Sequence, residues 1–111
     1  MNRVFIPHVP AQLNAETKIW TPTVNIEPAK KFGELHVLFD PSVSRAAIAP
    51  MAAAMRERMR DYDEGDFVCA LGDPTLIGVA CAIATRNAGG LLRLLKWDRM
   101  FKEYVLIEVR P

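Results

Sequence analysis

The sequence has few of the residues that most often reveal a function. It contains two cysteines and two histidines in 111 residues, and neither cysteine has a histidine or a second cysteine at metal-ligand spacing. Two cysteines do not form a disulfide framework, so we expect Cys69 and Cys81 to be buried free thiols. No serine lies in the glycine-flanked pattern of a hydrolase nucleophile. These absences argue against thiolate metal sites, disulfide scaffolds and serine hydrolases.

A strong net charge and a long apolar segment are also missing. The formal net charge is +1, so a general electrostatic attraction to nucleic acid or to an anionic membrane is not expected. The apolar runs are too short to span a bilayer. Residues 1–14 do not form a signal peptide, because Pro7 and Pro10 interrupt their short apolar stretch. We therefore expect no membrane association.

Half of the residues are apolar and 24% are charged, which is typical of a soluble globular domain. Residues 1–33 differ from the rest, because four prolines and few periodic apolar positions predict an extended, proline-rich arm. Within it, RVFI (3–6) and TVNI (23–26) each fit a short strand. A free tail seldom carries so many apolar side chains, so we expect the arm to pack on the core or on a partner.

Residues 34–111 predict one small α/β domain. Strands are expected at 34–39, 67–72, 91–97 and 104–110, and helices at about 50–61, after a lead-in from 42, and at 74–88. Two strand–helix–strand units imply parallel pairing, and the short link before the last strand implies an antiparallel hairpin. The predicted fold is α/β, a small mixed sheet in the order β-α-β-α-β-β after the extended N-terminal arm. The last strand alternates like an edge strand.

The helix expected at 74–88 is apolar on all sides until Arg86. Such a pattern predicts a largely buried helix. One small sheet leaves part of its surface uncovered, so we expect the arm or a second copy of the chain to cover the remainder.

Three aspartates are expected at the ends of predicted strands. Asp40, Asp73 and Asp98 would lie at the carboxyl edge of the sheet, where α/β proteins bind ligands. Three converging carboxylates would suit Mg²⁺. The structural alternative, which we favour, is that Asp40 and Asp73 cap helices before Pro41 and Pro74, while Asp98 starts a turn. A phosphate loop is not predicted, because the stretch around Asp73 has one glycine and a proline without an N–H.

The last two strands place basic residues beside an aromatic one. Arg93, Lys96 and Arg99 accompany Trp97, a combination that single-stranded nucleic-acid binders use. Acidic residues lie between them and leucines dominate the first of these strands, so the alternative is an ordinary solvated hairpin surface.

Three segments carry a resemblance to known proteins: IEPAKKFGELHVLFD, DFVCALGDPTLIGVACAIATRNAGG and LLRLLKWDRMFKEYVLIEV. They resemble a family of small uncharacterised proteins of tailed bacteriophages, with LGDP and LLKWDR as the most recognisable pieces. The resemblance covers most of the chain from about residue 24 and carries no activity with it. It implies a viral origin and expression in the host cytoplasm.

These observations favour a non-enzymatic protein that a phage encodes and that acts by protein–protein interaction with a host or phage macromolecule. The reasons are the missing catalytic set, the near-neutral charge and the proline-rich arm. A protein partner or a homo-oligomer is expected. One alternative is a Mg-dependent enzyme acting on phosphate esters with the three aspartates, in which case Mg²⁺ would be the cofactor. The other is a single-stranded nucleic-acid-binding module using the C-terminal hairpin.

Overall fold

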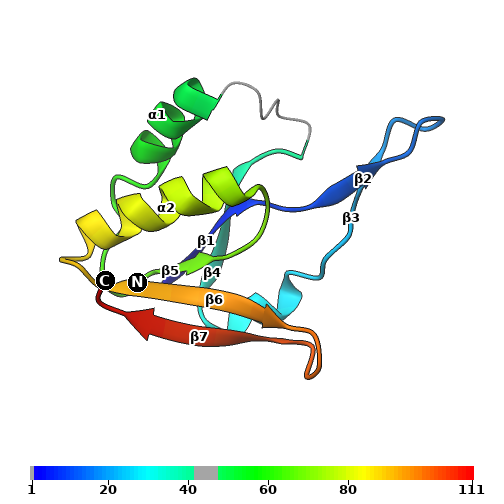
Figure 1. Cartoon of the computed structure of the whole chain (residues 1–111). Coiled ribbons are helices and arrows are strands. Elements are labelled where there is room, and N and C mark those ends of the chain that lie inside the picture. Colours follow the sequence, from blue (N-terminus) through cyan, green and yellow to red (C-terminus); the bar gives the residue numbers. More distant parts are fainter. Residues whose placement is uncertain (1, 42–47) are drawn as a thin grey trace.

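A computed structural model describes residues 2–41 and 48–111 (Figure 1). The strands are β1 (Arg3–His8), β2 (Ala11–Leu13), β3 (Trp20–Pro22), β4 (Glu34–Phe39), β5 (Phe67–Cys69), β6 (Leu92–Asp98) and β7 (Glu103–Val109). The helices are α1 (Ile48–Arg58), α2 (Pro74–Asn87) and the short 3-10 helix η1 (Glu27–Lys31). The predicted lead-in at 42–47 lies outside the described residues.

Five strands form one mixed sheet in the order β4-β1-β5-β6-β7. β4, β1, β5 and β6 are parallel, and β7 is antiparallel to β6. The α/β class is confirmed, as is the order β-α-β-α-β-β from residue 34 onward. α1 links β4 to β5 across β1, and α2 links β5 to β6, so the carboxyl ends of the four parallel strands share one edge of the sheet.

The main difference from the predicted sheet is β1, which lies in its interior between β4 and β5. Val4, Phe5 and Ile6 are buried, as expected for a strand that is covered on both faces and therefore lacks alternation. These residues were expected in the extended arm because residues 1–33 contain four prolines and few periodic apolar positions. Pro7 is tolerated because the paired register of β1 with β5 ends at Phe5, before the position without an N–H.

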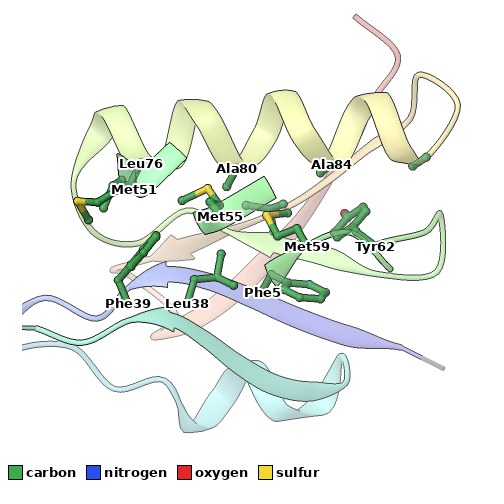
Figure 2. Close-up of a cluster of buried hydrophobic side chains, with 12 residues drawn as sticks. Phe5, Leu38, Phe39, Met51, Met55, Met59, Tyr62, Leu76, Ala80 and Ala84 are labelled. Carbon is green, nitrogen blue, oxygen red and sulfur yellow. The ribbon is translucent and has the colours of Figure 1, made fainter. Parts of the chain in front are cut away.

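α1 and α2 lie together on one face of the sheet (Figure 1). Met51 and Met55 of α1, and Met59 directly after it, belong to one buried cluster with Phe5 and Leu38 of the sheet (Figure 2). The buried side of α2 belongs to the same apolar cluster. The methionines at helical spacing are therefore core residues, as their apolar stripe predicts.

Within the described chain, α2 is less buried than the predicted, largely buried helix. Its buried residues are Leu76, Ala80 and Ala84, whereas Gly78 and Ala82 on the outer side are exposed. Ala and Gly are compatible with either environment, so an apolar composition did not distinguish a half-buried helix from a buried one. The N-terminal segment does not cover α2, because it packs on the other face of the sheet.

That other face is covered by residues 24–32, which include η1. Val24, Ile26 and Phe32 pack against a cluster that contains Val4 and Tyr104. The Tyr104 hydroxyl donates a hydrogen bond to the carbonyl oxygen of Asn25 at 2.9 Å. Burial raises the pKa of Tyr104 to about 12. The two faces of the sheet thus have two separate apolar clusters, one under the helices and one under this segment.

Candidate interaction surfaces

The three predicted aspartates do not form a cluster. The Asp73 carboxylate caps α2 by accepting a hydrogen bond from the Thr75 N–H at 2.9 Å. Asp98 accepts hydrogen bonds from the N–H groups of Met100 and Phe101 in the following turn. Asp40 follows β4, which is three strand spacings of roughly 4.8 Å away from β6.

Within residues 2–41 and 48–111, no three His, Cys, Asp or Glu side chains are grouped so that they could hold a metal ion. Asp73 has the capping role of the structural alternative, and Asp98 starts a turn as that alternative expects. The hypothesis of a magnesium-dependent enzyme therefore has no ligand cluster to support it among these residues.

The four predicted nucleic-acid-binding residues are divided between two environments. Arg93 belongs to the structure of the domain: its Nε donates to Glu108 Oε1 at 3.1 Å, and its guanidinium lies 4.0 Å from the centroid of the Phe67 ring. Trp97 packs edge-on against Tyr104, with ring centroids 4.8 Å apart. These contacts engage Arg93 in the fold and leave Trp97 only half exposed.

Lys96, Trp97 and Arg99 nevertheless share one open hollow of about 400 Å³, which Asp98, Val105 and Ile107 also line. Lys96 and Arg99 are exposed, and they make no ion pair with any described residue. The structure therefore brings three of the four predicted residues together and leaves Arg93 apart.

The turn between β6 and β7 carries two exposed apolar side chains. Met100 is 83% exposed and Phe101 is 70% exposed. They lie between Arg99 and Lys102, so an aromatic ring is presented to solvent between two cations. Phe101 is exposed because it lies in a four-residue turn between two strands, where a side chain has no sheet to pack on.

β7 is an edge strand with a row of exposed β-branched side chains. Val105, Ile107 and Val109 are 42%, 37% and 43% exposed, while Tyr104 and Leu106 turn to the opposite, covered face. β7 is the last strand in the order of the described sheet, so no described strand pairs with its outer edge. This arrangement confirms the predicted edge strand.

The β2–β3 hairpin extends away from the sheet and the helices (Figure 1). Leu13 is paired with Trp20, and Ala11 with Pro22, so these apolar side chains share one face of the ribbon. The two strands pack on each other, and neither makes an extensive contact with another described element. Both Leu13 and Trp20 are exposed. This hairpin is the surface that sequence reasoning missed most clearly.

A second unpredicted surface lies on the outer side of the two helices. Arg56 and Arg86 line two adjoining hollows of about 200 Å³ and about 220 Å³, which have Val79 and Ile83 among their apolar residues. Arg60 lines the first hollow and is paired with Glu57. Arg56 and Arg86 belong to the last turns of α1 and α2, where cations also complement the helix dipoles.

Comparison with known proteins adds a family. Residues 2–111 match the model of a family described as Phage Pam3 gp32-like protein, in agreement with the resemblance to small phage proteins. No match was found among curated proteins or among solved structures. None of the helices in the described residues has the length and the hydropathy needed to cross a membrane.

Proposed function

We propose that this chain, which belongs to the family of Phage Pam3 gp32-like proteins, is a non-enzymatic interaction protein that docks on another protein through its β2–β3 hairpin. The observation that supports the proposal is the position of the hairpin, which stands clear of the body with an apolar face. We place this activity in the cytoplasm of the infected host, where a phage or host protein is the partner.

An isolated two-stranded hairpin is only marginally stable in water, and it gains stability when its apolar face packs on something else. Among residues 2–41 and 48–111, no other element packs extensively on the hairpin. A partner that buries Leu13 and Trp20 would supply this packing, and tryptophan is among the residues that most often anchor protein interfaces.

The tip of the hairpin is ordered by its own hydrogen bonds, which lowers the entropic cost of docking. The Asn14 side chain accepts hydrogen bonds from the N–H groups of Glu16 and Thr17. Lys18 has a left-handed φ of 59° and donates its N–H to the Asn14 carbonyl. A preorganised turn loses less conformational freedom on binding than a flexible one.

The chemistry of the hairpin favours a protein over a nucleic acid or an anionic membrane. Its paired segments, 11–13 and 20–22, have no charged residue, and Glu16 and Lys18 at the tip offset each other. Binding to a polyanion depends on basic side chains that neutralise its charges. These uncharged, apolar side chains fit an apolar groove on the surface of a partner protein.

Photo-crosslinking in infected cells tests the proposal. A photoreactive phenylalanine analogue is placed at Leu13 and, as the matched control, at Val37 of β4; both side chains are 46% exposed. We expect a cross-linked protein from position 13 and not from position 37. The purified partner should then bind the Trp20→Ser variant at least tenfold more weakly than the wild type. Equal binding of this variant, or cross-linking from position 37 alone, contradicts the proposal.

The exposed ring of Phe101 favours a second candidate function, the binding of single-stranded nucleic acid at the C-terminal hairpin. A base would stack on Phe101, with phosphates near Lys96 and Arg99. A gel shift with a short single-stranded oligonucleotide should weaken as salt increases. Phe101→Ala should reduce binding more than Trp97→Ala, because one edge of Trp97 is already packed. No shift at low salt contradicts this candidate.

A further inference from the structure

We infer that the crease between α1 and α2 is a second docking surface, which binds an acidic amphipathic helix of a partner protein. The crease is formed by the two adjoining hollows that Arg56 and Arg86 line. This inference goes beyond docking by the β2–β3 hairpin and does not depend on it. Its basis is the pairing of two exposed arginines with an apolar floor.

The crease follows both helices. Each helix contributes residues spaced four apart, which lie on one side of a helix. They are Ala52, Arg56 and, directly after α1, Arg60 on one wall, and Val79, Ile83 and Asn87 on the other. Eight residues of helix rise by about 12 Å. The crease is therefore long enough for about two turns of a helix that lies along it.

The charge of this face is one-sided. Residues 48–60 and 74–87 contain four arginines and a single acidic residue, Glu57. Glu57 is paired with Arg60 at 2.6 Å, and the Arg58 guanidinium donates to a carbonyl oxygen of β4. Arg56 and Arg86 are exposed, and they make no ion pair with any residue that the structure describes. The described lining of the crease includes no acidic side chain.

The ends of the two helices hold these two arginines together. α1 and α2 connect parallel strands on the same face, so they run in the same direction and end at the same end of the sheet (Figure 1). There the Asn87 side chain donates a hydrogen bond to the Met59 carbonyl oxygen at 3.0 Å. Two like charges are thus fixed near each other. Carboxylates of a ligand would relieve their repulsion, and a guanidinium binds a carboxylate with two parallel hydrogen bonds.

A role in complementing the helix dipoles does not account for Arg56. α1 ends at Arg58, which already places a cation in the last turn, and Arg60 follows it. Arg56 and Arg60 are four residues apart, a spacing at which like charges destabilise a helix. A third cation at this helix end therefore adds repulsion, and binding of an acidic ligand gives it a function.

The floor and the shape of the crease favour an acidic protein helix over other anions. Val79 and Ile83 are only partly buried, and they offer apolar surface that a phosphate chain does not use. Nucleic-acid affinity depends on neutralising many phosphates, whereas the crease supplies two unpaired cations. A bilayer surface is too flat to enter it. An amphipathic helix meets both requirements, with apolar side chains on the floor and carboxylates beside them.

Titration of the purified full chain with a fluorescent peptide tests the inference. The probe is a helical peptide of about fifteen residues, with leucines along one face and glutamates beside them. A control peptide has lysine in place of every glutamate. We expect the acidic peptide to bind with a Kd below about 1 mM, more weakly as salt increases, and the basic peptide not to bind. No binding of the acidic peptide at about 1 mM overturns the inference.

A double variant locates the site. Arg56→Gln with Arg86→Gln should bind the acidic peptide about tenfold more weakly, because two charged hydrogen-bond donors are lost. Lys96→Gln with Arg99→Gln is the matched control, since it removes two other exposed cations, and it should bind like the wild type. Equal losses in the two double variants overturn the inference. Unchanged binding by the arginine variant with a lowered melting temperature also overturns it, because the arginines would then serve the helices alone.

Two further probes test the class of partner. They are a short single-stranded oligonucleotide and vesicles that contain phosphatidylglycerol. Binding of either probe through Arg56 and Arg86, without binding of the acidic peptide, overturns the choice of a protein helix. Trp20→Ser should bind the acidic peptide like the wild type, so failure of the hairpin proposal and failure of this inference are distinguishable.

Discussion

Among the single residues, Asp73 has a role that follows directly from its backbone and its neighbours. It precedes Pro74 in an extended conformation, φ −64° and ψ 130°, and its side chain satisfies the Thr75 N–H. Asp98 makes the same kind of bond in a turn. These local hydrogen bonds depend on residues two or three positions away, so the sequence was sufficient to propose them.

Replacing the cap at Asp73 should separate hydrogen bonding from charge. Asp73→Ala should lower the free energy of unfolding by about 0.5–2 kcal/mol, because α2 loses its N-cap. Asp73→Asn should lose much less, since an amide oxygen still accepts the hydrogen bond. Urea unfolding at neutral pH measures both variants. Equal losses would show that the carboxylate acts through its charge and not as a cap.

The raised pKa values of three buried side chains lead us to expect a loss of stability at alkaline pH. Burial raises the pKa of Cys69 from 9.0 to about 12 and that of Tyr104 from 10.0 to about 12, and it also raises the pKa of Tyr62. The unfolded chain releases these protons at lower pH than the folded chain does. Their contribution is therefore complete below about pH 9 and declines as the pH rises toward 12.

This decline is measured as the midpoint of urea unfolding at a series of pH values. Above about pH 9, the midpoint should fall less steeply with pH for Cys69→Ala than for the wild type. The Cys69→Ala variant is compared with itself at neutral pH, so that the cost of the smaller side chain cancels. Parallel pH profiles for the variant and the wild type would contradict the assignment of part of the decline to this thiol.

At the scale of the elements, two glycines differ in what surrounds them: Gly72 lies in the loop before α2, and Gly78 lies within α2. Gly72 has φ +105°, and a Cβ there would lie 2.6 Å from the His8 carbonyl oxygen. Position 72 requires glycine because the loop after β5 lies directly on the end of β1. Gly78 is within α2 and exposed, and a Cβ there would meet nothing within 4 Å.

Alanine substitutions at these two glycines should therefore change stability in opposite directions. Gly72→Ala should destabilise the fold by more than about 1 kcal/mol, through backbone strain and the clash with His8. Gly78→Ala should stabilise it by about 0.5–1 kcal/mol, because alanine is the better helix former. Thermal and urea unfolding measure both. A stabilised Gly72→Ala variant would contradict the close approach of the loop to β1.

At the scale of the whole molecule, the sheet with its two covered faces and the β2–β3 hairpin are structurally separate. The helices and the segment 24–32 cover the two faces of the sheet. The hairpin extends from this body, and its first and last residues lie close together. Pro10 and Thr23 are joined there by a hydrogen bond from the Thr23 N–H to the Pro10 carbonyl at 2.9 Å. A short link can therefore replace the hairpin without displacing the rest of the chain.

Replacing residues 11–22 by a short glycine-rich link should leave the melting temperature within a few degrees of the wild type. The reason is that the apolar contacts of the hairpin are within the hairpin itself. Tyr104→Ala is the comparison, and it should lower the melting temperature clearly, because it removes a buried ring and its bond to Asn25. A similar fall for the hairpin replacement would show that the hairpin supports the core.

The sequence by itself determined the α/β class, the order of elements after residue 34, the methionine face of α1, the cap at Asp73 and the alternating edge strand β7. Each of these depends on side-chain periodicity or on hydrogen bonds between residues close in the chain. The relation to a phage family also followed from local segments.

Only the tertiary structure decided that β1 is an interior strand, that α2 is half exposed, and that the strand-end aspartates form no cluster. It also decided that Lys96, Trp97 and Arg99 share a hollow while Arg93 is engaged elsewhere, and that the β2–β3 hairpin extends away from the sheet and the helices. These features depend on which strands become neighbours and which faces are covered. Strand pairing joins residues far apart in the chain, and local patterns do not specify that choice.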